Sequence, residues 1–231
     1  MADWLTYSLT DFLPFSRTTY LRLFELYDAR FRPAVAIGLL MGLALLWLAY
    51  SRTPGRLRIA VALLGGCWAW IGWAFLWQSY TPLLWAAPYA GVAFGLQGLL
   101  LLWAASRLPA TTRPSVAGLR ASIGYALLAY AVMISPLVGL WFERSWSGLE
   151  LFGSAPDPTT LATLGVLTLV RHPLGPILLP IPLAWALFSG LTLLAMDDPL
   201  WPLLPSAALA ALLMAITQGR AKLGLGAGLS T

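Results

Sequence analysis

The stretch Ala155–Pro173, APDPTTLATLGVLTLVRHP, poses the central question of the fold. Asp157 stands between two prolines, and the thirteen residues from Pro158 to Val170 are apolar or threonine. As an α-helix this run is about 20 Å long, whereas the hydrocarbon core of a bilayer is about 30 Å thick. It is too apolar for a surface loop and too short to cross a membrane alone as a regular helix.

The residues that follow this run are rich in proline. The segment HPLGPILLPIPLAW, residues 172–185, has prolines at 173, 176, 180 and 182. Each proline removes a backbone donor and pushes the preceding residue away from helical angles. We therefore expect helix to resume only from about Pro182, so that residues 157–196 form one short or re-entrant helical hairpin. Non-helical backbone at membrane depth must be covered by protein or face a water-filled cavity.

The composition of the whole chain indicates a membrane protein. Of its 231 residues, 59% are hydrophobic and 10% are charged, whereas soluble domains are about a quarter charged. Its twelve tryptophans and eight tyrosines suit the membrane–water boundary, which both rings favour. We predict an all-α membrane protein with about seven transmembrane segments.

The predicted segments form a single transmembrane domain over residues 33–217. They are Pro33–Tyr50, Leu57–Trp77, Leu83–Ala105, Gly118–Phe142, the short Pro158–Val170, the proline-rich Ile177–Met196, and Leu200–Thr217.

The basic residues predict an orientation. Nine Lys and Arg residues flank one side of these segments and five the other, and the richer side is expected in the cytoplasm. This places the C-terminal tail, residues 218–231, in the cytoplasm as a flexible segment. Four arginines before residue 33 argue against it, and a re-entrant fifth segment would put both termini on one side. Because the basic residues are scattered at segment ends, we expect anionic lipid and no nucleic acid as their partner.

Residues 1–32 form a separate amphipathic, interfacial segment. Tyr20, Leu23, Phe24, Tyr27 and Phe31 recur at steps of three and four residues, which predicts a helix with one apolar face. Such a helix lies in the membrane interface or caps the bundle. A gate over a cavity is the alternative.

Small residues recur at the spacing that lets membrane helices approach closely. The first segment has Gly38 and Gly42, and the third has Gly91 and Gly95. We interpret these as packing surfaces within one chain. The alternative is a contact face for a homo-oligomer or another membrane protein.

The candidate ligand-binding residues are few. Asp157 stands before Pro158, where it would be the N-cap of the short helix, and Thr159, Thr160 and Thr163 line that helix. Helix N-termini inside transporters commonly face bound ions or substrates. Gln97 lies in the middle of the third segment, where it needs a partner. The alternative is structural: threonines bonded to their own helix, a capping Asp157 and an interhelical bond from Gln97.

The remaining inventory does not favour an enzyme. One histidine, His172, and one cysteine, Cys67, cannot make a zinc site by themselves, and no cofactor motif is present. A lipid-modifying enzyme stays open, because such enzymes use sparse polar groups. The sequence therefore favours binding or passage of a small solute or ion at the Asp157 helix end. The alternative is a non-catalytic accessory or assembly subunit that packs against a partner.

Two stretches carry a resemblance to a known family. They are TYSLTDFLPFSRTTYLRLFELYDARFRPA, Thr6–Ala34, and GSAPDPTT, Gly153–Thr160. With them the chain resembles, over its full length, an uncharacterised bacterial family of membrane proteins of unknown function. The resemblance implies a multi-pass protein of the bacterial inner membrane. It assigns no functional residue.

Overall fold

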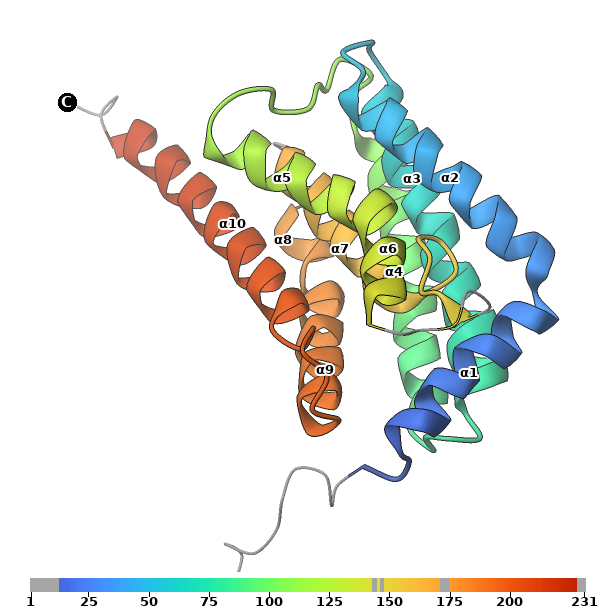
Figure 1. Ribbon diagram of the computed structural model, residues 1–231. Helices are drawn as coiled ribbons and strands as arrows, with labels where there is room; N and C mark the ends of the chain where they lie inside the picture. Colours follow the sequence, from blue (N-terminus) through green and yellow to red (C-terminus); the bar gives the residue numbers. More distant parts are fainter. Residues whose placement is uncertain (1–12, 143–144, 146–147, 171–174, 228–231) are drawn as a thin grey trace, which may run out of the picture.

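The computed structural model describes residues 13–142, 145, 148–170 and 175–227, with side chains described up to Thr217. Every regular element within these residues is helical, and none is a strand (Figure 1). This confirms the predicted all-helical class. Figure 1 shows α1 and the C-terminal end of α10 at opposite ends of the bundle.

The elements follow one another along the chain with few long connections. They are α1 (Arg17–Arg30), α2 (Arg32–Tyr50), α3 (Arg56–Trp70), the π-helix η3 (Ile71–Tyr80), α4 (Ala87–Arg107), α5 (Leu119–Ala129), the π-helix η4 (Tyr130–Ile134), α6 (Ser135–Trp141), α7 (Pro156–Leu169), α8 (Gly175–Leu178), α9 (Pro180–Ala195) and α10 (Leu203–Ala227).

Five of the described helical stretches are long and apolar enough to cross a bilayer. They are Arg32–Tyr50, Arg56–Tyr80, Ala87–Arg107, Leu119–Trp141 and Gly175–Ala195; a shorter apolar helix covers Leu203–Thr217. Several such helices in one chain indicate a membrane protein. A total of seven crossings, which would include α7, stays a prediction.

Paired glycines bring α3 and η3 against α4. A Cβ added to Gly65 would lie 2.9 Å from the Gly98 carbonyl oxygen, and one added to Gly98 would lie 2.8 Å from the Gly65 oxygen. Gly72 and Gly91 face each other in the same way, with both distances 2.8 Å. The backbones touch, which is how helices gain contact area where lipid supplies no hydrophobic drive.

Of the other predicted packing glycines, Gly38 and Gly42 also contact their own chain, whereas Gly95 does not. An added Cβ at Gly38 would lie 2.7 Å from the Phe152 carbonyl oxygen, and one at Gly42 would lie 3.0 Å from Val132. Gly95 has open space beside it. These contacts agree with packing within one chain, and a partner at these faces stays a prediction.

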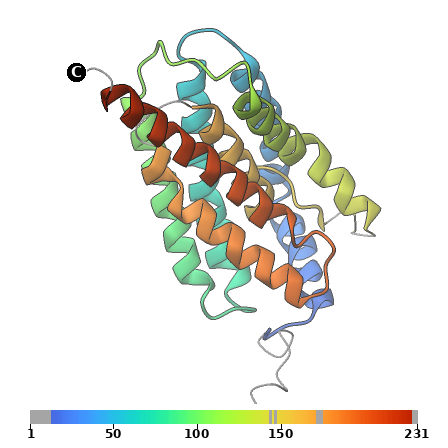
Figure 2. The same cartoon turned by 90° about the vertical axis from the view of Figure 1, so that its left-hand side faces the viewer.

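The helix α7 occupies the centre of the molecule. All fourteen of its residues are buried, because it packs against α3, α5, η4, α9 and α10 (Figures 1 and 2). Gly124 of α5 and Gly165 of α7 form a third close pair, with added Cβ atoms 3.0 and 2.8 Å from the facing carbonyl oxygens. At its far end, the Ser115 amide donates to the Leu169 carbonyl over 3.1 Å. The short apolar run of the sequence is therefore covered by protein on every side.

Irregular backbone lies before α7 and is buried. Residues 148–155 are non-helical except for a brief turn, and all of them are buried. Their backbone groups are paired locally: the Ala155 amide donates to the Leu151 carbonyl over 2.8 Å, and the Gly153 amide donates to the Thr159 hydroxyl over 2.9 Å. Gly153 takes a φ of 77°, which suits glycine. The chain thus meets the requirement that non-helical backbone at membrane depth be covered by protein.

The proline-rich segment corrects the expected position of the break. Helix resumes at Gly175, well before Pro182, and only Leu179 separates α8 from α9. Pro180 is the first residue of α9, and a proline in the first helical turn costs little because the N–H there lacks a helical partner. The Arg171–Leu174 connection lies outside the described residues. Whether 157–196 is re-entrant or crosses twice stays a prediction.

Proline also accounts for the π-helical segment η4. Pro136 has no N–H to bond the carbonyl four residues before it. Just before it, the Ser135 amide donates to the Tyr130 carbonyl, five residues back. The widened turn therefore precedes the proline within the Leu119–Trp141 stretch, and π-helical turns of this kind are often found near functional sites.

The amphipathic helix α1 caps the bundle through its predicted face. Tyr20, Leu23, Phe24 and Tyr27 are all buried, and α1 packs against η3. The Trp70 indole donates to the Tyr27 hydroxyl over 3.1 Å. The apolar face of this helix is thus buried against the bundle, and its position in the membrane interface stays a prediction.

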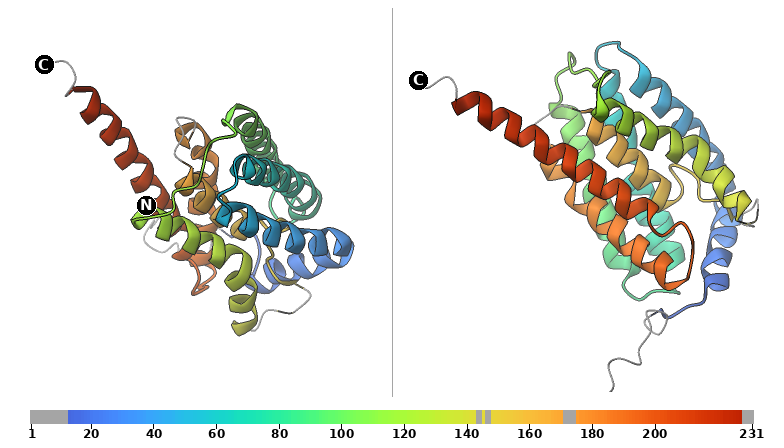
Figure 3. Two further views of the ribbon diagram at one scale, coloured as in Figure 1. Left: turned by 90° about the horizontal axis from the view of Figure 1, so that it is seen from above. Right: turned by 60° about the vertical axis from the view of Figure 1, so that its left-hand side comes forward.

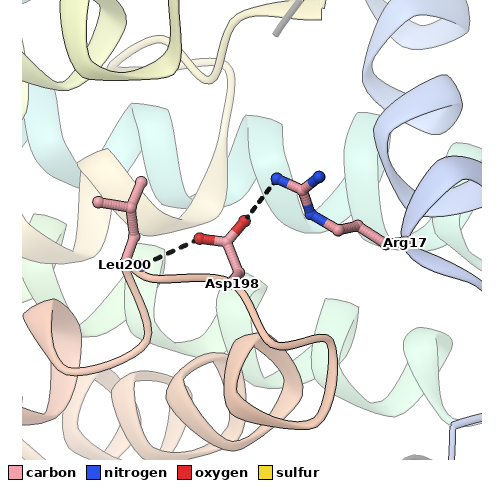
Figure 4. A network of polar contacts seen from close by, with 3 residues as sticks. All are labelled: Arg17, Asp198 and Leu200. Atoms are coloured by element: carbon pink, nitrogen blue, oxygen red, sulfur yellow. Dashed lines mark hydrogen bonds and ion pairs between the residues drawn. The ribbon is translucent and has the colours of Figure 1, made fainter. Parts of the chain in front are cut away.

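An ion pair ties the start of α1 to the turn between α9 and α10 (Figure 4). The Arg17 guanidinium donates to Asp198 over 3.3 Å, and the other Asp198 oxygen accepts from the Leu200 amide over 3.0 Å. Asp198 is 3% exposed, so its charge is held by two donors rather than by water.

Candidate functional site

Asp157 is inside the bundle and not at the helix cap. The N-cap of α7 is Ala155, and Pro156 takes the first helical position, so Asp157 falls in the first turn. The predicted N-cap role is therefore wrong, because the helix starts at Pro156, two residues earlier than Pro158 alone would indicate. The carboxylate instead accepts hydrogen bonds from the Trp185 indole at 2.8 Å and the Ser189 hydroxyl at 2.7 Å.

Ser189, the partner of Asp157 on α9, shows how far Asp157 lies from the end of the bundle. Ser189 precedes the last residue of α9, Ala195, by six positions, which is about 9 Å along a helix axis. Asp157 is 7% exposed. An acid at this depth is costly unless it is paired or hydrogen-bonded.

The threonines of α7 serve different purposes. Thr159 donates to the Ala155 carbonyl at 2.8 Å, and Thr163 donates to the Thr159 carbonyl at 2.8 Å while accepting from the Trp68 indole at 2.8 Å. These bonds fit the structural interpretation, in which threonines bond back to their own helix. Thr160 is fully buried, and its hydroxyl has no hydrogen-bond partner within the described residues.

Gln97 supplies a hydrogen-bond donor that a proline lacks. Its amide nitrogen donates to the Leu178 carbonyl over 3.0 Å. In a regular helix that carbonyl would accept from residue 182, but Pro182 has no N–H. Gln97 of α4 therefore replaces the missing donor, and the predicted partner of this residue is a backbone group. Its amide oxygen has no partner within the described residues.

The predicted residues do not converge on one site. Of them, Asp157 alone lines a small cavity, of about 30 Å³, between η4, α6, α7, α9 and α10. The cavity wall also includes Glu150, Tyr130 and Ser135. This volume holds at most a few water-sized particles, since one water needs roughly 10–15 Å³ of such space. Two acidic residues and two residues with hydroxyl groups thus line one small cavity.

Glu150 is the residue that the sequence did not single out. It lies in the buried irregular segment before α7 and is 9% exposed. The local sequence GLELFG surrounds it with apolar residues, and an acid within an apolar loop was the available signal. Its closeness to Asp157 depends on the folding of that loop into the bundle, which no spacing rule gives.

A third buried acid lies next to Glu150. Asp28 of α1 is 8% exposed, and its Oδ1 atom has no hydrogen-bond partner within the described residues. Burial and the nearby negative charge of Glu150 raise the pKa of the Asp28 carboxyl from 3.8 to about 7. Asp28 therefore titrates near neutral pH where α1 meets the bundle.

Asp28 makes the stability of the protein depend on pH. Between pH 4 and 7 the folded chain binds more protons at this group than the unfolded chain does, because the folded pKa is about 7. The free energy of unfolding therefore falls as pH rises through this range and levels off above it. We expect Asp28→Asn to flatten this dependence and to raise the free energy of unfolding at pH 8 by about 2 kcal/mol. Denaturant unfolding at pH 5 and pH 8 measures it, and an unchanged pH dependence in the variant would contradict the assignment.

The described residues include no group of three or more His, Cys, Asp or Glu side chains that could hold a metal ion.

Comparison with models of protein families assigns the chain to a family. A family model of unknown function matches residues 17–223, from α1 nearly to the end of α10. The chain belongs to DUF6064. The match confirms membership of an uncharacterised family. No curated protein and no solved structure compared with the DUF6064 chain gave a match, so the site is interpreted from its own chemistry.

Proposed function

We propose that this DUF6064 protein is a multi-pass membrane protein that binds, and lets pass, a proton or a small monovalent cation between Asp157 and Glu150. One observation carries the proposal: a deeply buried Asp157, oriented by two donors from α9, lines a water-sized cavity together with Glu150.

The size of the cavity favours an ion over an organic solute. About 30 Å³ is far below the roughly 300–1,000 Å³ of pockets that bind small molecules. The general prediction of a small solute or ion thereby narrows to a particle no larger than a few waters.

The charge of the cavity favours a cation. Two carboxylates in a water-poor interior repel each other, so that a shared proton or a bound cation stabilises the pair. The Tyr130 and Ser135 side chains in the cavity wall supply hydroxyl oxygens, which are ligands of the same kind.

A polar hollow supports entry from the α1 end of the molecule. It has a volume of about 350 Å³ and lies between α1 and the residues Ser145 and Gly148, with Arg17 and Glu25 also in its wall. Gly148 is two residues from Glu150 in the chain. A cation would lose its water in passing from this hollow toward the carboxylates.

Flux measurements in proteoliposomes test the proposal. With a pH-sensitive dye inside, wild-type vesicles should equilibrate an imposed pH gradient faster than protein-free vesicles, and Asp157→Asn should remove most of the difference. Asp197→Asn is the matched control, because Asp197 is an exposed acid whose φ of 54° asparagine tolerates. Sodium and potassium gradients at constant pH distinguish a metal cation from a proton. Equal fluxes in wild-type, Asp157→Asn and protein-free vesicles to all three ions would overturn it.

We further propose the orientation given by the basic residues, with the C-terminus in the cytoplasm of a bacterial inner membrane. Thr53, between α2 and α3, and Gln78, near the end of η3, are both exposed. With Cys67→Ala as background, we expect a membrane-impermeant maleimide to label Gln78→Cys in intact cells and Thr53→Cys only in inverted vesicles. Labelling of Thr53→Cys in intact cells would reverse the orientation.

A second candidate is an accessory subunit that packs against a partner. Figure 3 shows the C-terminal half of α10 extending away from the other helices. Leu209, Leu213 and Ile216 on this helix are 58%, 49% and 45% exposed. Photo-crosslinkers at Leu209 and Leu213 should capture a membrane protein if this candidate holds, whereas capture of lipid alone would reject it.

A further inference from the structure

A long apolar groove opens beside the junction of α1 and α2, away from the carboxylate cavity. Its volume is about 570 Å³. Phe31, Ile37 and Met41 form one wall, and Gly66 and Trp70 of α3 form the other. Ile37 and Gly66 are both exposed, so the groove is open on the outer surface of the bundle.

With α1 in the membrane interface, as its sequence predicts, we expect the groove to run from that interface to the middle of the bilayer. One end of the groove is at Arg30, the last residue of helix α1. The other end is at Met41, nine residues after α2 begins at Arg32. Nine residues span about 14 Å of helix, and half of the hydrocarbon core is about 15 Å. The groove is therefore as long as one lipid leaflet is thick.

The charge at the interfacial end suits a phosphate. Arg30 is the one charged side chain among the residues that line the groove. It is exposed and lies over the Phe31 ring, 5.2 Å from its centre, and no described carboxylate forms an ion pair with it. Arg32, two residues after Arg30, is also exposed. A guanidinium binds phosphate oxygens through two parallel hydrogen bonds, which stacking on an aromatic ring leaves free.

We propose that this groove binds one anionic glycerophospholipid, with an acyl chain along Ile37, Met41 and Gly66 and its phosphate on Arg30. The apolar wall, the length of one leaflet and the cation at headgroup level together match the parts of such a lipid in order. A zwitterionic lipid fits the wall equally well but gains less from Arg30 and Arg32.

Gly66 provides a clean way to fill the groove. A Cβ added there meets nothing within 4 Å, and the same holds for Gly95 of α4, outside the groove. We therefore expect Gly66→Leu to block the groove with little effect on helix packing, and Gly95→Leu is the matched control. Arg30→Gln removes the headgroup contact and keeps the apolar wall.

The test is native mass spectrometry of detergent-purified protein incubated with phosphatidylglycerol or phosphatidylcholine. We expect wild type to retain one phosphatidylglycerol with about fivefold preference, Arg30→Gln to lose that preference, and Gly66→Leu to lose retention roughly tenfold. Gly95→Leu should behave as wild type. Unchanged retention in Gly66→Leu, or equal loss in Gly95→Leu, would overturn the proposal. So would a change of oligomeric state in Gly66→Leu without a change in lipid, which would identify a protein occupant.

Discussion

Gly165→Leu is expected to abolish stable folding, because it forces α5 and α7 apart at the centre of the molecule. An added Cβ at Gly165 would lie 2.8 Å from the Gly124 carbonyl oxygen and 3.1 Å from Leu128. The first contact is with backbone, which cannot move aside as a flexible side chain does. All residues of α7 are buried, so the displacement passes to every helix around it. We expect a loss of about 3 kcal/mol or more.

Size-exclusion chromatography of a fluorescent fusion, followed by unfolding in mixed micelles, measures this effect. Gly66→Leu is the control, since the same side chain placed at an exposed glycine with open space should leave the elution profile and stability unchanged. Equal stability of Gly165→Leu and Gly66→Leu would contradict the close pairing of α5 with α7.

Asp157→Ala is expected to destabilise the protein by about 3 kcal/mol, whereas Asp157→Asn should cost about 1 kcal/mol. Alanine leaves the Trp185 indole and the Ser189 hydroxyl without their buried acceptor, which each now reaches within 2.8 Å. Asparagine keeps one oxygen that accepts from one of the two donors. Its amide cannot replace the second carboxylate oxygen, so one bond is weakened.

The difference between these two variants separates stability from function. Thermal unfolding at one pH gives the ranking wild type, Asp157→Asn, Asp157→Ala. Equal unfolding temperatures for wild type and Asp157→Ala would show that the two donors have water as their partner, and the central position of Asp157 would then be wrong.

The sequence predicted those parts of the fold that follow from periodicity. The face of α1 formed by Tyr20, Leu23, Phe24 and Tyr27 is buried as its spacing indicated. The five long apolar stretches lie where the hydrophobic runs placed them. In each case the local pattern and the final packing depend on the same side chains.

The break around α7 was harder to place, because prolines act according to their position in a helix. Four prolines indicated irregular backbone after α7, yet Pro180 starts a helix and Gln97, from a distant helix, supplies the donor that Pro182 lacks. The buried irregular segment lies before α7 instead. It is stabilised by contacts such as Gly38 against Phe152, which connect residues far apart in sequence and leave no local pattern.

The candidate site was predicted in part for the same reason. Asp157 was singled out because an acid beside a short apolar helix is unusual. Glu150 became its neighbour only through the fold, and Thr159 and Thr163 proved to bond their own backbone. The local sequence therefore identified Asp157, whereas Glu150 could be identified only from the tertiary structure.

Infrared difference spectroscopy of the reconstituted protein tests most directly whether Asp157 in the central cavity takes up a proton or cation. Spectra recorded between low and high pH, and with and without sodium, should contain a carboxyl band that disappears in Asp157→Asn and persists in Asp197→Asn. If neither pH nor sodium produces any band that depends on Asp157, the carboxylate is only a structural acceptor for Trp185 and Ser189, and the proposed function is wrong.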